Sequence, residues 1–261
     1  MVPEEAEKFL QSWSGQGLIA EEGLGYRFPA WAIPKLEGWP APYFYLPEVD
    51  STQDELRELA ELGAPAGTLV IAELQHAGRG RRGGKWESPP GAGLTFSVLL
   101  RPPSPGPYQL ALSLAVQGAA GVGRVKWPND ILAPDGGKLA GILLEGAWRG
   151  DNLRYLLAGV GVNFAPSLQP GRSGIWQWSG LGRKDFLYRF WQHLQRWTTS
   201  SALAQAPEVF AQRWGALGQT VTAHTPSGDV TGKVVAIDPE GALVLEAPGA
   251  VRIPAGWLET S

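Results

Sequence analysis

Apolar residues are distributed differently in three successive parts of the chain. Between residues 43 and 216, continuous runs rich in Leu, Val and Ile alternate with segments of helical patterning. The runs predict buried strands at residues 68–74, 94–100, 138–145 and 153–162. Helices are predicted at residues 51–62, 108–120, 185–198 and 207–214. Residues 42–216 are therefore expected to form an α+β domain built on a mixed sheet.

The last part, residues 217–261, changes to short alternating runs. These occur at residues 220–223, 230–237, 242–245 and 251–253. Between them lie two turn sequences with strong breaker residues, Pro226-Ser227-Gly228-Asp229 and Asp238-Pro239-Glu240-Gly241. The pattern predicts a small β-barrel of short strands.

The first part, residues 1–41, predicts a helix, a hairpin and a linker. The helix covers residues 4–13 and carries Glu4, Glu5 and Glu7 against Lys8 alone. Residues 18–20 and 26–28 flank a Glu-Glu-Gly turn and predict the hairpin, and four prolines between residues 29 and 42 mark the linker. An acidic helix has the wrong sign to approach nucleic-acid phosphates, so DNA binding is not expected.

Composition narrows the class of protein without indicating an activity. Hydrophobic residues make up 44% of the chain and charged residues 18%, which is typical of a globular protein. The absence of cysteine excludes disulfides, thiolate zinc sites and a cysteine nucleophile. A net charge of -3 gives no overall attraction to nucleic acid or anionic lipid. No apolar run reaches membrane-spanning length and the first residues are acidic, so the cytoplasm is the expected location and no membrane partner is expected.

Residues suited to chemistry are concentrated in three short segments. The first is a glycine-rich loop with four cations and no acid, Gly78-Arg79-Gly80-Arg81-Arg82-Gly83-Gly84-Lys85-Trp86. Its glycines let the backbone approach an anion, and successive N–H groups can form an anion-binding concavity. The other two segments are Lys126-Trp127-Pro128-Asn129-Asp130 and Gly137-Lys138-Leu139-Ala140-Gly141-Ile142-Leu143. Lys138 enters an apolar strand, where a buried lysine needs an anionic partner.

Together these segments closely resemble the biotin protein ligase family, the enzymes that attach biotin to carboxylase carrier proteins. The resemblance runs from about residue 42 to the C-terminus. It implies a biotin ligase/lipoate ligase-like catalytic domain over residues 42–216 and an SH3-like barrel over residues 217–261. The N-terminal helix and hairpin look like a truncated remnant of the winged helix-turn-helix that some members carry.

The resemblance also implies a reaction. The carboxylate of biotin would attack the α-phosphorus of ATP and expel pyrophosphate, and a lysine of the apo biotin carboxyl carrier protein would then attack the resulting biotinyl-5′-AMP. ATP and Mg²⁺ are the implied cofactors. The metal would be held through phosphates rather than by a cage of side chains, with Asp130 as its one side-chain candidate. The family also allows a homodimer.

The family's functional positions map onto residues of this chain. The catalytic positions are Lys138, Arg79 and Arg81. The biotin-binding positions are Ser51, Thr52, Gln53, Gln75, Arg79, Gly80, Arg81, Lys138, Gly141 and Gly161. The ATP or adenylate positions are Arg81, Lys85, Trp86, Asn129, Asp130, Lys138 and Asn163. The chain departs from the family at Gly84, where many members carry a second basic residue, and this departure suggests a looser loop.

Each motif also has a plainer structural explanation. Ser51 and Thr52 would serve as helix caps, and Thr52 and Glu55 have capping-box spacing. The sequence from Pro128 to Asp130 is ordinary turn sequence, and the glycines would also permit close sheet packing. His76, which adjoins the basic loop, is expected to be a bystander.

Two other functions stay open at this point. A lipoate or octanoate ligase or transferase shares the catalytic architecture, although the arginine-rich loop favours biotin. A nucleic-acid-binding regulator is suggested by the same loop and by the wing-like hairpin, and is opposed by the acidic helix. Hydrolases and kinases are disfavoured because the chain has neither a Gly-x-Ser-x-Gly elbow nor a Gly-Lys-Ser/Thr phosphate loop.

Overall fold

The fold is described by a computed structural model of the chain. It covers residues 19–21, 25–27, 36, 38–165, 171–247, 249–254 and 256–258. The predicted helix at residues 4–13 lies outside these ranges. Within them, β1 (Ile19–Glu21) and β2 (Gly25–Arg27) pair antiparallel, which confirms the predicted hairpin.

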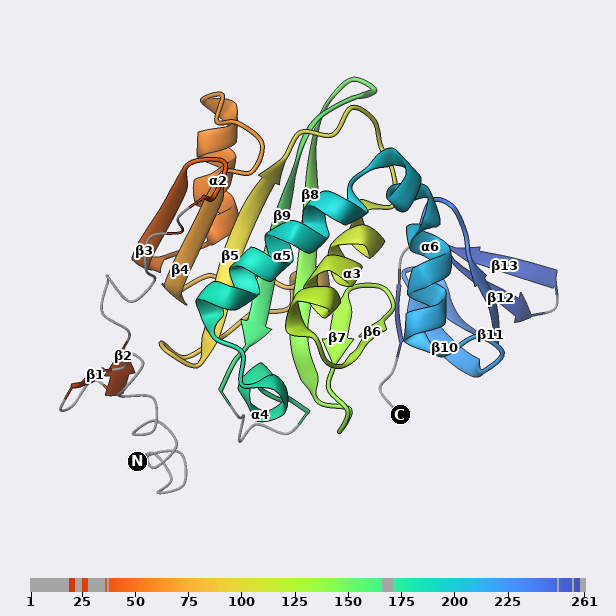
Figure 1. Cartoon of the computed structure of the whole chain (residues 1–261). Helices are drawn as coiled ribbons and strands as arrows, with labels where there is room; N and C mark the ends of the chain where they lie inside the picture. Colours follow the sequence, from red (N-terminus) through yellow and green to blue (C-terminus); the bar gives the residue numbers. More distant parts are fainter. Residues whose placement is uncertain are drawn as a thin grey trace.

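A seven-stranded mixed sheet forms the centre of the molecule (Figure 1). Its order is β3-β4-β5-β9-β8-β7-β6, in which β3 runs parallel to β4 and all other neighbours are antiparallel. The four strands predicted from apolar runs are confirmed, and they occupy the middle positions as β4, β5, β9 and β8. The strands are β3 (Tyr43–Val49), β4 (Leu69–Gln75), β5 (Gly93–Leu100), β6 (Arg124–Lys126), β7 (Asp130–Leu132), β8 (Lys138–Arg149) and β9 (Asn152–Asn163).

Helices cover the two faces of this sheet. On one face α2 buries Leu56 and Ala60 against Val70 of β4. On the other face lie α3 and α5 (Figure 1), and Leu69 and Ile71 of the same strand belong to the main core on that side. Successive side chains of a strand point to opposite faces, which explains this division. The helices are α2 (Thr52–Glu61), α3 (Tyr108–Ala120), α4 (Ile175–Ser179), α5 (Arg183–Trp197) and α6 (Ser200–Trp214), with a short 3-10 turn η2 (Arg81–Gly83).

The C-terminal part forms a second, five-stranded antiparallel sheet in the order β13-β12-β11-β10-β14. Helix α6 contacts both sheets and lies between them (Figure 1). In the described residues β13 and β14 do not pair with each other, so the predicted barrel is an open sheet. The strands are β10 (Thr220–Thr225), β11 (Gly228–Ile237), β12 (Leu243–Ala247), β13 (Gly249–Ile253) and β14 (Trp257–Leu258).

One helix begins earlier than the sequence predicts. Helix α6 starts at Ser200, with the Thr199 hydroxyl accepting a hydrogen bond from Ala202 N at 3.4 Å. Pro207, the predicted first residue, is buried inside the helix. Proline is common in the first turn of helices, where its missing N–H costs nothing, but here the helix extends seven residues before it. None of the helices in the described ranges is long and apolar enough to span a membrane.

A buried ion pair fixes both ends of the long loop between β4 and β5. Glu73 and Arg183 are only 7% and 9% exposed and share two hydrogen bonds, at 2.9 and 3.0 Å. Glu73 also accepts hydrogen bonds from Gly91 N at 2.5 Å and from the Tyr45 hydroxyl at 2.9 Å, and Arg183 donates to Gly93 O. Burial alone would raise the pKa of Glu73, but the charge of Arg183 and these hydrogen bonds hold that pKa below its ordinary value.

Replacing Glu73 by Gln should lower the free energy of unfolding at pH 7 by about 3–5 kcal/mol, because it removes the buried carboxylate that pairs with Arg183. The pKa of Glu73 is lowered from 4.5, so its contribution is present above that pH and is lost as the pH falls through the folded-state pKa. Urea denaturation of both proteins at several pH values measures the difference, which should shrink only below pH 4.5. Glu48→Gln, at an exposed pair with His76, is the matched control. A loss no larger than that of the control would contradict the role assigned to the pair.

Candidate active site

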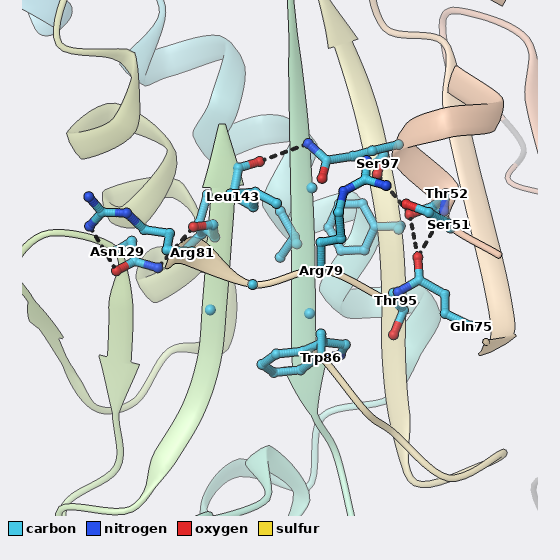
Figure 2. Close-up of a pocket in the computed structure, with 18 of the residues that line it drawn as sticks. Ser51, Thr52, Gln75, Arg79, Arg81, Trp86, Thr95, Ser97, Asn129 and Leu143 are labelled. Atoms are coloured by element: carbon cyan, nitrogen blue, oxygen red, sulfur yellow. Dashed lines mark hydrogen bonds between the residues drawn. The ribbon is translucent and has the colours of Figure 1, made fainter. Parts of the chain in front are cut away.

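A pocket opens where the N-terminus of α2, the basic loop and the middle strands of the sheet meet (Figure 2). Its volume is about 480 Å³, counting the space open to solvent. None of its described lining residues is acidic. The lining residues are Ser51, Thr52, Gln53, Gln75, Arg79, Gly80, Arg81, Trp86, Thr95, Phe96, Ser97, Asn129, Lys138, Gly141, Ile142, Leu143, Gly159, Val160 and Gly161.

Most of the residues assigned from the sequence therefore lie around one cavity. The three that do not line it are Lys85, which is exposed, and Asp130 and Asn163, which contact Lys138. Thr95 and Ser97 are two buried residues of β5 that also line the pocket but were not predicted as site residues from the sequence. The available signal was two polar residues at alternate positions of an otherwise apolar strand.

The start of α2 presents hydroxyl and amide groups to the pocket. Gln75 Oε1 accepts hydrogen bonds from Thr52 N at 2.8 Å and from Thr52 Oγ1 at 3.0 Å, and Thr52 Oγ1 lies 2.8 Å from Ser97 Oγ (Figure 2). The predicted capping role is wrong: Ser51 occupies the N-cap position, but its side chain makes no cap hydrogen bond, and the hydroxyl of Thr52 faces the sheet. These contacts fix the orientation of the Gln75 amide at the pocket wall.

Gln53 has a structural role in the ligand-free protein. Its Nε2 donates to Leu143 O at 3.1 Å and to Leu157 O at 3.3 Å, so it joins β8 to β9. Gly159 makes room for it, because a Cβ there would lie 2.8 Å from Gln53 Cδ. Both donors of the amide are thus used within the protein, although the side chain lines the cavity.

Two glycines create the space that the ring of Trp86 fills. Gly141 of β8 and Gly161 of β9 are paired across the two strands. A Cβ on Gly161 would lie 2.1 Å from Trp86 Cε2, and one on Gly141 would lie 3.3 Å from Trp86 Cζ3. Lys138 Nζ lies 5.8 Å from the centre of the ring. The aromatic ring, the lysine and the bare backbone therefore form one continuous surface.

Lys138 is held by contacts to its backbone and to its side chain. Its N–H donates to Gly171 O at 2.8 Å, and its carbonyl accepts from Ser173 N at 3.1 Å and from Asn163 Nδ2 at 2.8 Å. Its Nζ lies 2.7 Å from Asp130 Oδ1. The anionic partner expected from the sequence is thus supplied by Asp130 in the ligand-free protein, and Lys138 itself lines the cavity.

The basic loop is ordered by its own hydrogen bonds, such as Gly80 N to Gly84 O at 2.6 Å, and its arginines have different partners. Arg79 binds Asp54 of α2, and Arg81 Nη1 lies 3.4 Å from Asn129 Oδ1. Burial lowers the pKa of the Arg81 guanidinium, which nevertheless stays charged at neutral pH.

Arg82 connects the loop to the C-terminal sheet. It has a left-handed backbone, with φ of 58°, and its guanidinium lies 4.5 Å from the ring centre of Trp257 in β14. The ring of Trp257 in turn stacks on His224 at 4.2 Å. The second sheet thus contacts the loop directly.

Comparison with known proteins agrees with this geometry. The profile of the Biotin/lipoate A/B protein ligase family matches residues 45–163, and that of the Biotin protein ligase C terminal domain matches residues 216–256. A biotin–[acetyl-CoA-carboxylase] ligase of Paracoccus denitrificans is 32% identical over 80% of this chain and 97% of its own. The chain belongs to the biotin protein ligase family.

Two further relatives extend the comparison. A bifunctional ligase/repressor BirA of Bacillus spizizenii is 33% identical over 80% of this chain and 70% of its own. A biotin protein ligase of Aquifex aeolicus, solved in complex with biotin and ATP, superposes with a TM-score of 0.66 at 28% identity, over 84% of this chain and 97% of that one. The fold and the family expected from the sequence are thereby confirmed.

Replacing Gly161 by Ala should weaken biotin binding by about tenfold or more, equivalent to about 1.4 kcal/mol. The added methyl would collide with Trp86 and displace the ring from the pocket floor. Isothermal titration calorimetry measures the affinity. Gly182→Ala is a suitable control, because φ there is -78° and the nearest atom to its Cβ is Asp185 Oδ2 at 3.5 Å. Unchanged affinity in Gly161→Ala would remove the Trp86 contact from the binding surface.

Proposed function

We propose that the chain ligates biotin to a lysine of a biotin carboxyl carrier protein in an ATP-dependent reaction that passes through biotinyl-5′-AMP. The observation that carries this proposal is the pocket, where Lys138, Arg79 and Arg81 line a cavity that also presents amide and hydroxyl groups. Two anions, the biotin carboxylate and the α-phosphate, must meet in the first step, and a site lined by cations suits that requirement. The relatives named as biotin ligases agree with it.

The polar end of the pocket suits the head group of biotin. A ureido group offers two N–H donors and a carbonyl acceptor, and the wall formed by Ser51, Thr52 and Gln75 supplies both kinds of partner. Lys138, Arg79 and Arg81 line the same cavity. One ligand can therefore meet this wall with its head group and the cations with its carboxylate.

The first step makes an acyl phosphate from a poor acyl donor. A carboxylate oxygen attacks the α-phosphorus, the bond from that phosphorus to the bridging oxygen breaks, and pyrophosphate leaves. Lys138 and Arg81 lower the barrier by balancing the charge gathered between the two anions, since fixed cations in a protein site need no reorganisation. The lysine of the carrier protein then attacks the carbonyl carbon, and AMP leaves.

Mg²⁺ fits this site only as a partner of the nucleotide. The described residues contain no group of three or more His, Asp or Glu side chains placed to hold a metal. Asp130 is the side chain that would assist, although it is already paired with Lys138. Phosphate oxygens would supply most of the ligands, as is common for Mg²⁺, and the ion would screen the phosphate charge.

The matched family also includes lipoate ligases, so the substrate needs a direct test. Biotin should raise the melting temperature of the chain, and lipoate at the same concentration should not. Incubation with biotin and ATP should release pyrophosphate and leave biotinyl-5′-AMP detectable by mass spectrometry. Stabilisation by lipoate in place of biotin would overturn the proposal.

Replacing Lys138 by Ala should slow adenylate formation by about 10²–10³-fold, since a charge-assisted contact made in the transition state is worth about 3–4 kcal/mol. Pyrophosphate release in a single turnover measures the rate. Lys233→Ala, on the exposed side of the C-terminal sheet, controls for the loss of one positive charge. Near-normal turnover by Lys138→Ala, with the fold verified by circular dichroism, would exclude Lys138 from the mechanism.

Replacing Arg81 by Ala should increase the leakage of biotinyl-5′-AMP by about tenfold, while its formation slows less, because a hydrogen bond to a charged group contributes about 1.5–3 kcal/mol. Formation depends chiefly on Lys138, whereas retention depends on the loop staying closed over an anionic product. Biotinylation of a bystander protein reports the leakage, and exposed Arg149→Ala is the control. Equal leakage from the variant and the wild type would show that Arg81 does not hold the product.

A further inference from the structure

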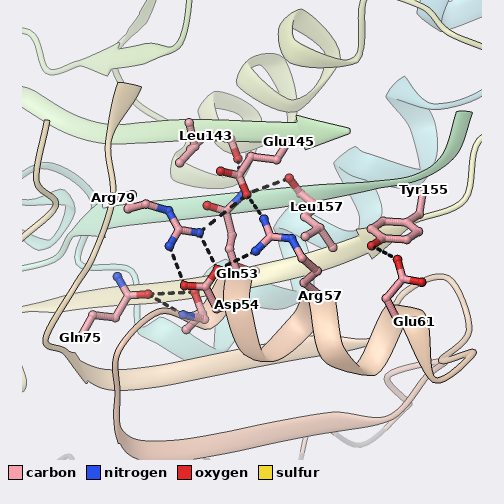
Figure 3. Close-up of polar contacts among 12 residues, drawn as sticks. Gln53, Asp54, Arg57, Glu61, Gln75, Arg79, Leu143, Glu145, Tyr155 and Leu157 are labelled. Atoms are coloured by element: carbon pink, nitrogen blue, oxygen red, sulfur yellow. Dashed lines mark hydrogen bonds and ion pairs between the residues drawn. The ribbon is translucent and has the colours of Figure 1, made fainter. Parts of the chain in front are cut away.

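Four side chains of alternating charge close a ring beside the pocket (Figure 3). Arg79 donates to Asp54 through Nη1 at 2.5 Å and through Nη2 at 2.8 Å, and Asp54 also accepts from Arg57 at 2.6 Å. Glu145 accepts from Arg57 at 2.6 Å and lies 3.8 Å from Arg79. We call this set, formed by Asp54, Arg57, Arg79 and Glu145, the charge ring.

The charge ring joins three elements that are distant in sequence. Asp54 and Arg57 lie three residues apart in the first turns of α2, Glu145 belongs to β8, and Arg79 belongs to the basic loop. Of the four, only Arg79 lines the pocket. The charges of the ring sum to zero, so both carboxylates are matched before any ligand arrives. The side chain of Asp54 raises the pKa of Arg79, chiefly through their hydrogen bonds.

We propose that Asp54, supported by Glu145, is the positioning residue that holds Arg79 at the pocket wall for its anionic substrate. The inference rests on the proposed function, because it names what prepares one cation of that site. An arginine has many rotamers and lies here on a loop rich in glycine, so an unsupported side chain would have to be ordered by the ligand itself. The bidentate contact with Asp54 makes that ordering part of the folded state.

The geometry leaves Arg79 able to bind an anion while it is held. A guanidinium has five N–H donors, and the contacts with Asp54 use one donor on each of two nitrogens. The side chain of Arg79 is 37% exposed and that of Asp54 is 43% exposed, so solvent screens the pair and its strength is modest. A weak ion pair is sufficient to position Arg79, and it still lets the loop move when substrates enter and leave.

A second ion pair on the same helix provides the comparison. Glu61 lies at the other end of α2 and accepts a hydrogen bond from the hydroxyl of Tyr155 (Figure 3). It also accepts hydrogen bonds from Arg154. It is similarly exposed, at 48%, and its partners lie outside the pocket lining. Glu61→Gln therefore removes the same kind of charge from the same helix without affecting Arg79.

The first test needs no substrate and no activity. Limited digestion with trypsin cuts after arginine and lysine, so the basic loop reports its own mobility. Asp54→Asn should be cut in the loop about fivefold faster than the wild type, the size of effect expected for a partly exposed ion pair. Glu61→Gln should match the wild type, and Asp54→Glu should restore slow cleavage. Equal cleavage of Asp54→Asn and the wild type would overturn the proposal.

The second test asks whether Asp54 acts through Arg79. Asp54→Asn should raise the KM for biotin in pyrophosphate release up to about fivefold and change kcat less, because binding then includes the ordering of Arg79. In an Arg79→Ala background, Asp54→Asn should have no further effect, whereas Glu61→Gln should have the same small effect in both backgrounds. Additive losses for Asp54 and Arg79 would overturn the proposal. If the wild type releases no pyrophosphate, the proposed function fails, and the trypsin result alone decides the positioning of the loop.

Discussion

The buried pair of Glu73 and Arg183 is the constraint on which the site depends. It ties the end of β4, the backbone just before β5, the edge strand β3 and the first residue of α5 to one carboxylate. Such a pair is costly to desolvate, and the cost is offset only because each carboxylate oxygen is hydrogen-bonded. Because its two ends are fixed in this way, the loop between β4 and β5 can be rich in glycine and still keep Arg79 and Arg81 at the pocket.

The pocket combines a floor of glycine backbone, on which one aromatic ring lies, with a wall of cations. Gly141 and Gly161 expose backbone where a side chain would fill the cavity, and Trp86 rests on them. The chain as a whole has a net charge of -3, yet none of the described residues lining the pocket is acidic. The attraction for anions is therefore local, and the acidic groups of the neighbourhood, Asp54 and Asp130, are placed behind the cations as counter-charges.

The sequence predicted those parts of the fold whose signals are local. Helix α3 was predicted to the residue because its apolar run ends at Gly121, which has φ of 67° and closes the helix. Strand β3 was not predicted: it contains Pro47 and Glu48, and it is held at the edge of the sheet by pairing with a strand that begins 26 residues after its own start. Pairing of that kind depends on the tertiary fold rather than on local pattern.

The candidate site, like the fold, could be predicted from the sequence only in part. The resemblance to the family indicated which side chains would gather around the cavity, but the partners of those side chains required the structure. The capping box at Thr52 was wrong because the hydroxyl bonds to Gln75, 23 residues away. Asp54 carried no signal in the sequence, because an acid in the first turn of a helix already has an ordinary explanation in the helix dipole.

Two arginines of the basic loop are held by different kinds of force. Arg79 is held by the opposite charge of Asp54, whereas Arg82 lies over the ring of Trp257 in the C-terminal sheet. Dissolved salt screens an exposed ion pair strongly, and it has less effect on the contact between a guanidinium and an aromatic face. Rising ionic strength is consequently expected to weaken the contact of Arg79 with α2 before it weakens the contact of Arg82 with the C-terminal sheet.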